Sequence, residues 1–197
     1  MPQPARPSLS LSRPSSRLIG LAGRSGAGKD TAFQFLADSL PFQFERRAFA
    51  DSMKASAMAA FGLSADLADE FKTRATVTVA FGENEPVVSL TGREFIQRYG
   101  TEAHRHIFGD EFWIDRTLTD FQPQAITVVT DVRLDNEADA IRALDGEVWL
   151  IERPGDRIAE SGHITEAGIS GPDEVIVNDS SLGVFRDRVM EAWHRGG

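Results

Sequence analysis

The sequence predicts an α/β fold: a five-stranded parallel β-sheet with helices on both faces, a helical insertion and a lid. From residue 17 onward, short apolar runs alternate with segments of helix length. The apolar runs are continuous rather than alternating, which is typical of strands buried on both faces of a parallel sheet. A chain of 197 residues can bury a substantial core, and the absence of cysteine excludes disulfides, thiolate nucleophiles and Cys-based metal sites.

The predicted elements follow one another as in a doubly wound sheet. Strands are predicted over residues 18–22, 44–49, 125–130, 146–151 and 174–178. Helices are predicted over residues 29–39, 52–61 and 136–144, with a last helix that reaches about residue 193. Pro41 ends the first of these helices and Gly146 closes the third.

Residues 62–124 interrupt the alternation and are predicted to form the helical insertion. A small strand or a hairpin is expected over residues 76–81 and 83–86, followed by two helices from about Thr91 and Glu111. The first helix has a start signal, because Thr91 and Glu94 have the spacing of a capping box.

Residues 1–16 have the composition of a disordered tail, so the domain is expected to cover residues 17–197. This segment holds four prolines, five serines and two arginines and no acidic residue. A transit peptide is the alternative, but the prolines oppose an amphipathic helix, and there is no secretory hydrophobic region. A cytoplasmic protein is therefore expected, in the host cytoplasm if the source is viral.

The net charge of −9 argues against a protein that binds polymeric nucleic acid or an anionic membrane through its overall field. No apolar run approaches the roughly 20 residues that a membrane span needs. The 21 basic residues comprise 18 arginines and only 3 lysines. An anionic small-molecule partner would therefore need arginines that are grouped locally. The oligomeric state is left open, with a homodimer as one alternative.

The strongest motif has the spacing G-x4-GK and stands between a predicted strand and a predicted helix. It comprises Gly23, Arg24, Ser25, Gly26, Ala27, Gly28 and Lys29. Backbone amides of such a loop and the helix N-terminus bind phosphates, and the lysine reaches the β- and γ-phosphates. The motif predicts a P-loop NTPase fold that binds ATP; the alternative is a tight glycine-rich turn with a solvated lysine.

Asp30 stands where Ser or Thr normally supplies a hydroxyl to Mg²⁺, and Thr31 follows it. A carboxylate there can bind the ion or one of its waters, because Mg²⁺ prefers oxygen ligands and keeps several waters. The alternative is an acid in the first helical turn that the helix dipole favours. Thr31 is expected to contact phosphate.

Asp131 ends the third predicted strand, where P-loop enzymes place the carboxylate that holds Mg²⁺ or assists the nucleophile. It could instead cap the following helix, although Asp135 and Asn136 are better placed to do so. Arg133 would project toward the crevice outside the strand ends, where open α/β sheets bind ligands.

Other polar groups have weaker signals. Asp51 and Lys54 lie one helical turn apart and can both face the crevice, or pair with each other as an exposed salt bridge. Arg93 and Gln97 share a helix face, and with Arg105 they can bind a phosphate and a base edge, or remain solvated.

The loop between the fourth and fifth strands is predicted to be a lid over residues 153–171. A loop of this length in a compact domain is usually functional or disordered. Arg153 and Arg157 are candidates to stabilise a migrating phosphoryl group while the lid excludes water.

Seven short segments, in the same order along residues 17–194, resemble the deoxynucleoside monophosphate kinases of bacteriophages, which are adenylate-kinase-like P-loop kinases. They are GKDT (28–31), FADSMK (49–54), TGREFIQRYGTE (91–102), DVRLDNEADAIRAL (131–144), ERPG (152–155), HITE (163–166) and VNDSSL (177–182). The family also has Asp after the P-loop lysine. Residues 62–90 match only loosely.

This resemblance implies transfer of the γ-phosphoryl group of Mg-ATP to a deoxynucleoside monophosphate, with a dNDP as product. It implies that Lys29 and the loop bind ATP, that residues 62–124 bind the acceptor, and that Asn178 approaches the adenine. The acceptor pocket would be lined by Asp51, Arg93, Gln97, Arg105, Arg133 and Glu137. Two alternatives stay open: a kinase of another metabolite such as phosphomevalonate, and a non-catalytic ATP-binding switch.

Overall fold

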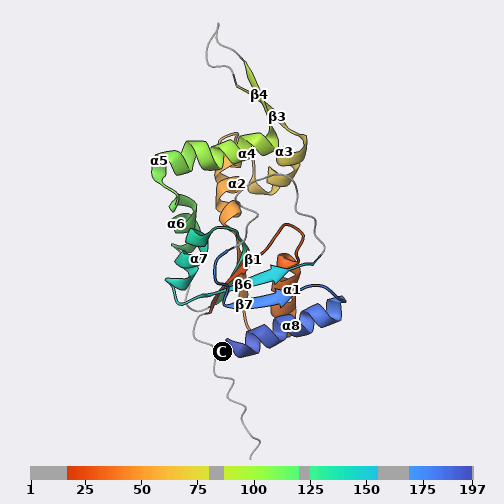
Figure 1. The fold of residues 1–197 in the computed structure, drawn as a ribbon. Helices are drawn as coiled ribbons and strands as arrows, with labels where there is room; N and C mark the ends of the chain where they lie inside the picture. Colours follow the sequence, from red (N-terminus) through yellow and green to blue (C-terminus); the bar gives the residue numbers. More distant parts are fainter. Residues whose placement is uncertain (1–16, 80–86, 120–124, 155–168, 197) are drawn as a thin grey trace, which may run out of the picture.

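The computed structural model describes residues 17–79, 87–119, 125–154 and 169–196, and its centre is a five-stranded parallel sheet. The strands are β1 (Leu18–Ala22), β2 (Phe44–Arg47), β5 (Ile126–Val132), β6 (Glu147–Glu152) and β7 (Glu174–Val177), in the order β2-β5-β1-β6-β7 (Figure 1). Every neighbouring pair in this sheet is parallel. The predicted five-stranded parallel sheet is therefore confirmed, and the carboxyl ends of its strands lie at one edge.

Helices cover both faces of this sheet. On one face α1 (Lys29–Ser39) and α8 (Leu182–Arg195) bury Leu36 and Phe185 against Ile19 and Trp149. The other face is covered by α6 (Phe112–Leu118), α7 (Asp135–Arg142) and the first turn of α2 (Phe49–Ala59). The continuous apolar runs of β1 and β5 are explained by this double coverage.

The insertion forms a second, smaller core beyond the sheet. Its elements are η1 (Ala65–Leu67), α3 (Ala68–Arg74), the antiparallel hairpin β3 (Thr76–Val79) and β4 (Val88–Thr91), α4 (Gly92–Gly100), the π-helical η2 (Thr101–Arg105) and α5 (His106–Phe108). Met58 of α2, Ala68 and Ile96 are buried together there. Figure 1 shows this part above the sheet, joined to it through α2 and α6.

Most predicted elements are confirmed. Outside the insertion, the second strand ends at Arg47 rather than Phe49, and α2 begins at Phe49 rather than Ser52; the other exceptions lie in the insertion. The capping box is present: the Glu94 amide donates to Thr91 Oγ1 and the Thr91 amide to the Glu94 carboxylate. The part of the prediction that covers residues 83–86 lies outside the described residues, and β4, which pairs with β3, begins at Val88. Helix α3 was not predicted. The tail and residues 155–168 of the predicted lid, with Arg157, lie outside the described residues.

Among the described residues, no helix is long and apolar enough to cross a membrane.

Candidate active site

The loop between β1 and α1 depends on glycine at two positions where backbone and side chains approach closely. Gly23 has φ +135°, and a Cβ there would lie 2.4 Å from the carbonyl oxygen of Ile151 on the neighbouring strand β6. Gly28 has φ +111°, and a Cβ there would lie 2.8 Å from Asn178 Nδ2. Both positions combine a left-handed conformation with steric crowding, so the sequence G-x4-GK is required by the loop's shape.

Lys29 begins α1 and folds back over this loop. Its Nζ donates to the carbonyl oxygens of Gly23 at 2.7 Å and Arg24 at 2.8 Å. Burial lowers the pKa of Lys29 and nearby Arg133 lowers it further, while Asp30 and Asp131 oppose them. The lysine is therefore a half-buried cation held by backbone, beside the amides that would meet a phosphate.

Two residues from neighbouring strands brace the loop. Asn178, directly after β7, donates from Nδ2 to the Ala27 carbonyl at 2.8 Å. Arg153, directly after β6, donates from Nη1 to the Gly26 carbonyl at 3.3 Å. The structure thus brings a residue expected at the adenine and one expected in the lid onto the same loop.

Asp30 and Asp51 are joined by an arginine that the sequence did not suggest. Arg46, on β2, lies 3.4 Å from Asp30 through Nε and 2.9 Å from Asp51 through Nη1. Burial opposes the charge of Arg46, but the pKa of its guanidinium is raised overall because Asp51 and Asp30 favour the charged form. The alternative of an Asp51–Lys54 salt bridge is wrong, since Lys54 pairs with Asp69 at 3.3 Å.

Asp131 caps a helix, though not the one that follows it in sequence. Its two carboxylate oxygens accept the amides of Phe49 at 2.8 Å and Ala50 at 2.9 Å, which begin α2. Burial raises the pKa of Asp131 and these two hydrogen bonds oppose the rise. This carboxylate therefore fixes the start of α2 against β5.

The cap of α7 is also different from the prediction. Neither Asp135 nor Asn136 caps it; the buried Glu137 accepts the amides of Arg133 at 2.8 Å and Leu134 at 3.2 Å. Burial raises the pKa of Glu137, and these hydrogen bonds and Arg105 oppose the rise.

Arg105 is the last residue of the π-helical turn η2, and this turn places its side chain beside Glu137. Its Nη2 lies 3.6 Å from Glu137 Oε1, although the two residues belong to the insertion and to the sheet domain. The buried indole of Trp113 donates to the Gly100 carbonyl at 3.0 Å and fixes the start of that turn. Such turns inside helices occur often at functional sites.

The insertion adds a lysine that the sequence did not single out. Lys72, on α3, is half-buried; burial lowers its pKa, and Arg93, Lys54 and Arg133 lower it further. Helices α3 and α4 meet closely here, because a Cβ at Gly92 would lie 3.1 Å from the Lys72 Cα. Gln97 is exposed on α4, and no contact joins it to these cations.

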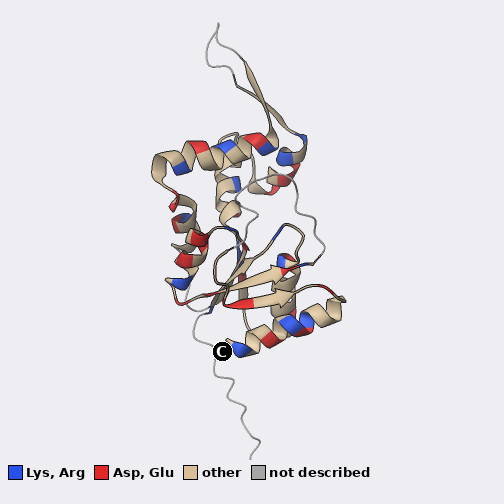
Figure 2. Ribbon diagram, viewed as in Figure 1, with Lys and Arg blue, Asp and Glu red and all other residues tan. Residues whose placement is uncertain are grey.

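Most arginines of the described chain are paired with carboxylates, and the exceptions are informative. The paired ones are Arg17, Arg46, Arg47, Arg74, Arg98, Arg105, Arg142, Arg188 and Arg195. Within the described ranges Lys29, Lys72, Arg93 and Arg133 have no carboxylate ion pair, and neither do Arg116, Arg153 and Arg186. The first four lie close together: Arg133 lowers the pKa of Lys29, and Arg93 and Arg133 lower the pKa of Lys72. Figure 2 shows blue segments in α2, α3 and α4 and at the start of α1.

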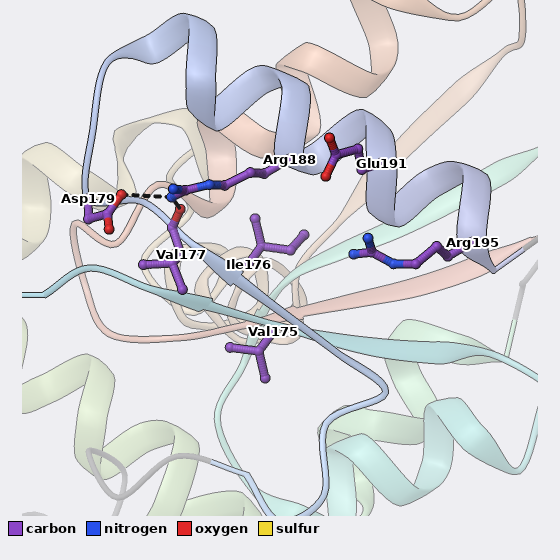
Figure 3. A pocket seen from close by; sticks show the side chains of 7 residues that line it. All are labelled: Val175, Ile176, Val177, Asp179, Arg188, Glu191 and Arg195. Carbon is purple, nitrogen blue, oxygen red and sulfur yellow. Dashed lines mark hydrogen bonds and ion pairs between the residues drawn. The ribbon is translucent and has the colours of Figure 1, made fainter.

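A cavity elsewhere on the molecule contains cations that, unlike these four, are paired with carboxylates. It lies between β7 and α8 and is lined by Val175, Ile176, Val177, Asp179, Arg188, Glu191 and Arg195 (Figure 3). Arg188 is held by Asp179 at 2.7 Å, and Arg195 by Glu174 at 2.9 Å. The cations of this cavity are already neutralised by these carboxylates, so the cavity is not suited to an anionic ligand.

The carboxylates fit a magnesium ion that is held mainly by nucleotide phosphates. The Asp30 side chain is 80% exposed beside the loop, whereas both oxygens of Asp131 accept amides. No cluster of three or more His, Cys, Asp or Glu side chains suited to a metal occurs in the described ranges. Mg²⁺ commonly takes one or two carboxylates, substrate phosphates and waters.

The structure thus brings together nearly all the predicted residues that it describes. Arg46 and Lys72 were missed, and the one signal for Lys72 was the rarity of lysine, since all three lysines lie in this region. Ser25 is exposed and Thr31 half-buried at the loop.

Several known proteins are similar to this chain. A sequence profile for deoxynucleotide monophosphate kinase matches residues 63–189. A protein of Acanthamoeba polyphaga mimivirus named putative deoxynucleotide monophosphate kinase is 32% identical over 190 residues, covering 88% of this chain and 94% of that protein. The deoxynucleotide monophosphate kinase of Enterobacteria phage T4 is 35% identical over 97 residues, 46% of this chain and 40% of that protein. Dephospho-CoA kinase from Campylobacter jejuni, a solved structure, is 14% identical, with a TM-score of 0.44 and coverage of 92% and 98%.

Proposed function

The chain belongs to the deoxynucleotide monophosphate kinase family and is thus an enzyme of the kinase class, and from this premise we propose its reaction. It transfers the γ-phosphoryl group of Mg-ATP to the 5′-phosphate of a deoxynucleoside monophosphate and releases ADP and a dNDP. In this step the bond between the bridging oxygen and the γ-phosphorus breaks, and an acceptor phosphate oxygen bonds to that phosphorus.

The observation that carries this proposal is the group of four cations without carboxylate partners. Lys29, Arg133, Lys72 and Arg93 extend from the phosphate-binding loop to the insertion in a protein with a net charge of −9. Lys29 and Lys72 are half-buried beside other cations, and a half-buried charge next to like charges is costly unless an anion neutralises it. Two anionic nucleotides that bind side by side, one on the loop and one under the insertion, meet this requirement.

On the donor side, the loop amides and Lys29 would bind the ATP phosphates. Asp30, directly or through water, and Asp131, through water, are the residues that would hold Mg²⁺, which would neutralise charge on the transferred phosphoryl group. Arg153 and Asn178 keep the loop in its binding conformation through Gly26 and Ala27.

On the acceptor side, Arg133, Arg93 and Lys72 would bind the 5′-phosphate, with Lys54 and Arg105 beside them. The acceptor phosphate is already an anion, so no protein nucleophile or base is required. Catalysis then consists of bringing two mutually repelling anions into line and neutralising their charge. The many arginines outside the loop support an acceptor site rather than a simple ATP-binding switch.

A panel of acceptors tests this proposal. Purified protein with Mg-ATP is offered dAMP, dGMP, dCMP, dTMP, the four ribonucleotides and phosphomevalonate, and ADP release is measured. We expect turnover that depends on a deoxynucleoside monophosphate. Turnover with phosphomevalonate alone, or ATP binding with no acceptor-dependent turnover, would overturn the proposal.

A further inference from the structure

Arg46 connects the start of α1 with the start of α2 through one guanidinium. Its Nε lies 3.4 Å from Asp30 in the first turn of α1, and its Nη1 donates to Asp51 in the first turn of α2 at 2.9 Å. The three side chains are 41%, 80% and 48% exposed. Exposed ion pairs contribute little to the stability of a fold, so a contribution to folding stability does not explain this arrangement.

The two helices joined in this way serve different parts of the site. Helix α1 begins with Lys29 and follows the phosphate-binding loop. Helix α2 carries Lys54 and packs against α4 and α6. The inner side of α2 is already fixed by Asp131, whose carboxylate accepts two of its amides. On the exposed side, Arg46 joins the start of α2 to the start of α1 instead.

Because Asp30 and Asp51 share one guanidinium, the strength of the ion pair that each forms with Arg46 depends on the other. Asp30 and Asp51 compete for one cation, so a charge that arrives beside Asp30 changes how strongly Arg46 holds Asp51. Arginine suits this position, because its fork can contact two carboxylates at once, whereas a lysine presents a single point charge.

We propose that Arg46 is a positioning residue that couples donor binding at the loop to acceptor binding under the insertion. This inference rests on the proposed function, since it requires that both nucleotides bind. Arg46 contacts neither reacting group; it acts by holding Asp51, and with it the start of α2, in register with Asp30.

The test measures binding rather than turnover. Each of dAMP, dGMP, dCMP and dTMP is titrated calorimetrically into the protein with and without Mg²⁺ and a non-hydrolysable ATP analogue. In the unmodified protein we expect the accepted nucleotide to bind about fivefold more tightly, or better, when the analogue is present. In Arg46→Met and in Arg46→Lys this ratio should fall below about twofold, and it should also decline with added salt in the unmodified protein.

Two further variants make the outcome decisive. Asp51→Asn should reduce the ratio as Arg46→Met does, and the double variant should reduce it no further. Arg74→Met removes an exposed ion pair with Glu70 on α3 and should leave the ratio unchanged. A ratio near one in the unmodified protein, or a ratio retained in Arg46→Met, would overturn the inference alone. Failure of all four nucleotides to bind would overturn the proposed function and this inference with it.

Discussion

The proposed donor and acceptor halves of the site hold their positive charges in different ways. In the donor half, Lys29 is fixed by two backbone carbonyls of a loop in which Gly23 and Gly28 leave no room for a Cβ. That loop directly follows β1, a strand that is buried along its whole length. In the acceptor half, the cations Lys54, Lys72 and Arg93 project from three short helices that share a separate small core.

This difference indicates what each half contributes. The donor half is organised before the nucleotide arrives, so its residues should act mainly on kcat. The acceptor cations repel one another until an anion arrives, so their loss should act mainly on the KM of the acceptor. The predictions below test that division, from the largest expected effect to the smallest.

Lys29→Ala should have the largest effect. It removes the cation nearest the β- and γ-phosphates, and kcat should fall about 10²- to 10³-fold, as for other preorganised groups that stabilise developing charge. Steady-state kinetics with ADP release as the readout measures the fall, and circular dichroism with a thermal melt verifies that the fold is retained. Near-normal turnover in a folded variant would contradict the role of the loop.

Arg93→Met and Arg133→Met should come next, with kcat/KM for the deoxynucleoside monophosphate lowered about 10- to 100-fold, the scale of a charge-assisted hydrogen bond. The KM for ATP should change little in Arg93→Met. The matched control is Arg98→Met on the same helix, where Arg98 lies 3.9 Å from Glu102. Equal losses in Arg93→Met and Arg98→Met would show that α4 does not bind the acceptor.

The two halves also differ in how far the sequence predicts them. The strand at 18–22 and the helix at 29–39 are found as predicted, because glycines, Pro41 and a continuous apolar run define them locally. Helix α3 has only Ala68 buried, and its helical state depends on contacts with α2 and α4. Neither propensity nor periodicity identifies so short a helix, and Lys72 was missed with it.

The contacts of individual carboxylates could not be predicted from the sequence either. Asp131 was expected at the strand end, and it lies there, but its contacts are to amides 81 and 82 residues away. The Arg46 contacts with Asp30 and Asp51 likewise join β2 to two different helices. Such pairings depend on the order of strands in the sheet, which no local pattern encodes.

Lys72→Met tests the residue that only the structure revealed. Removing one of several cations should raise the KM for the acceptor about 3- to 10-fold and leave kcat nearly unchanged, because the neighbouring arginines still bind the phosphate. Lys72→Arg should restore most of the loss. Arg74→Met, two residues along α3, is the matched control, since Arg74 is 79% exposed and pairs with Glu70. If both methionine variants behave alike, Lys72 does not contact the acceptor.

Glu137→Gln should have the smallest effect, and the effect should be on stability rather than turnover. The variant probes the ion pair between Glu137, which caps α7, and Arg105 of the insertion. Burial raises the pKa of Glu137 above its ordinary 4.5, so in the window above that value the folded protein holds a proton that the unfolded chain has lost. The stability contribution of Glu137 is therefore full below pH 4.5 and declines as the pH rises through the folded pKa. Urea unfolding at several pH values should show the unmodified protein losing about 1 kcal/mol relative to the variant as the pH rises. Parallel stability curves would mean that Glu137 keeps its charge at no cost, and that Arg105 and the two amides fully compensate its burial.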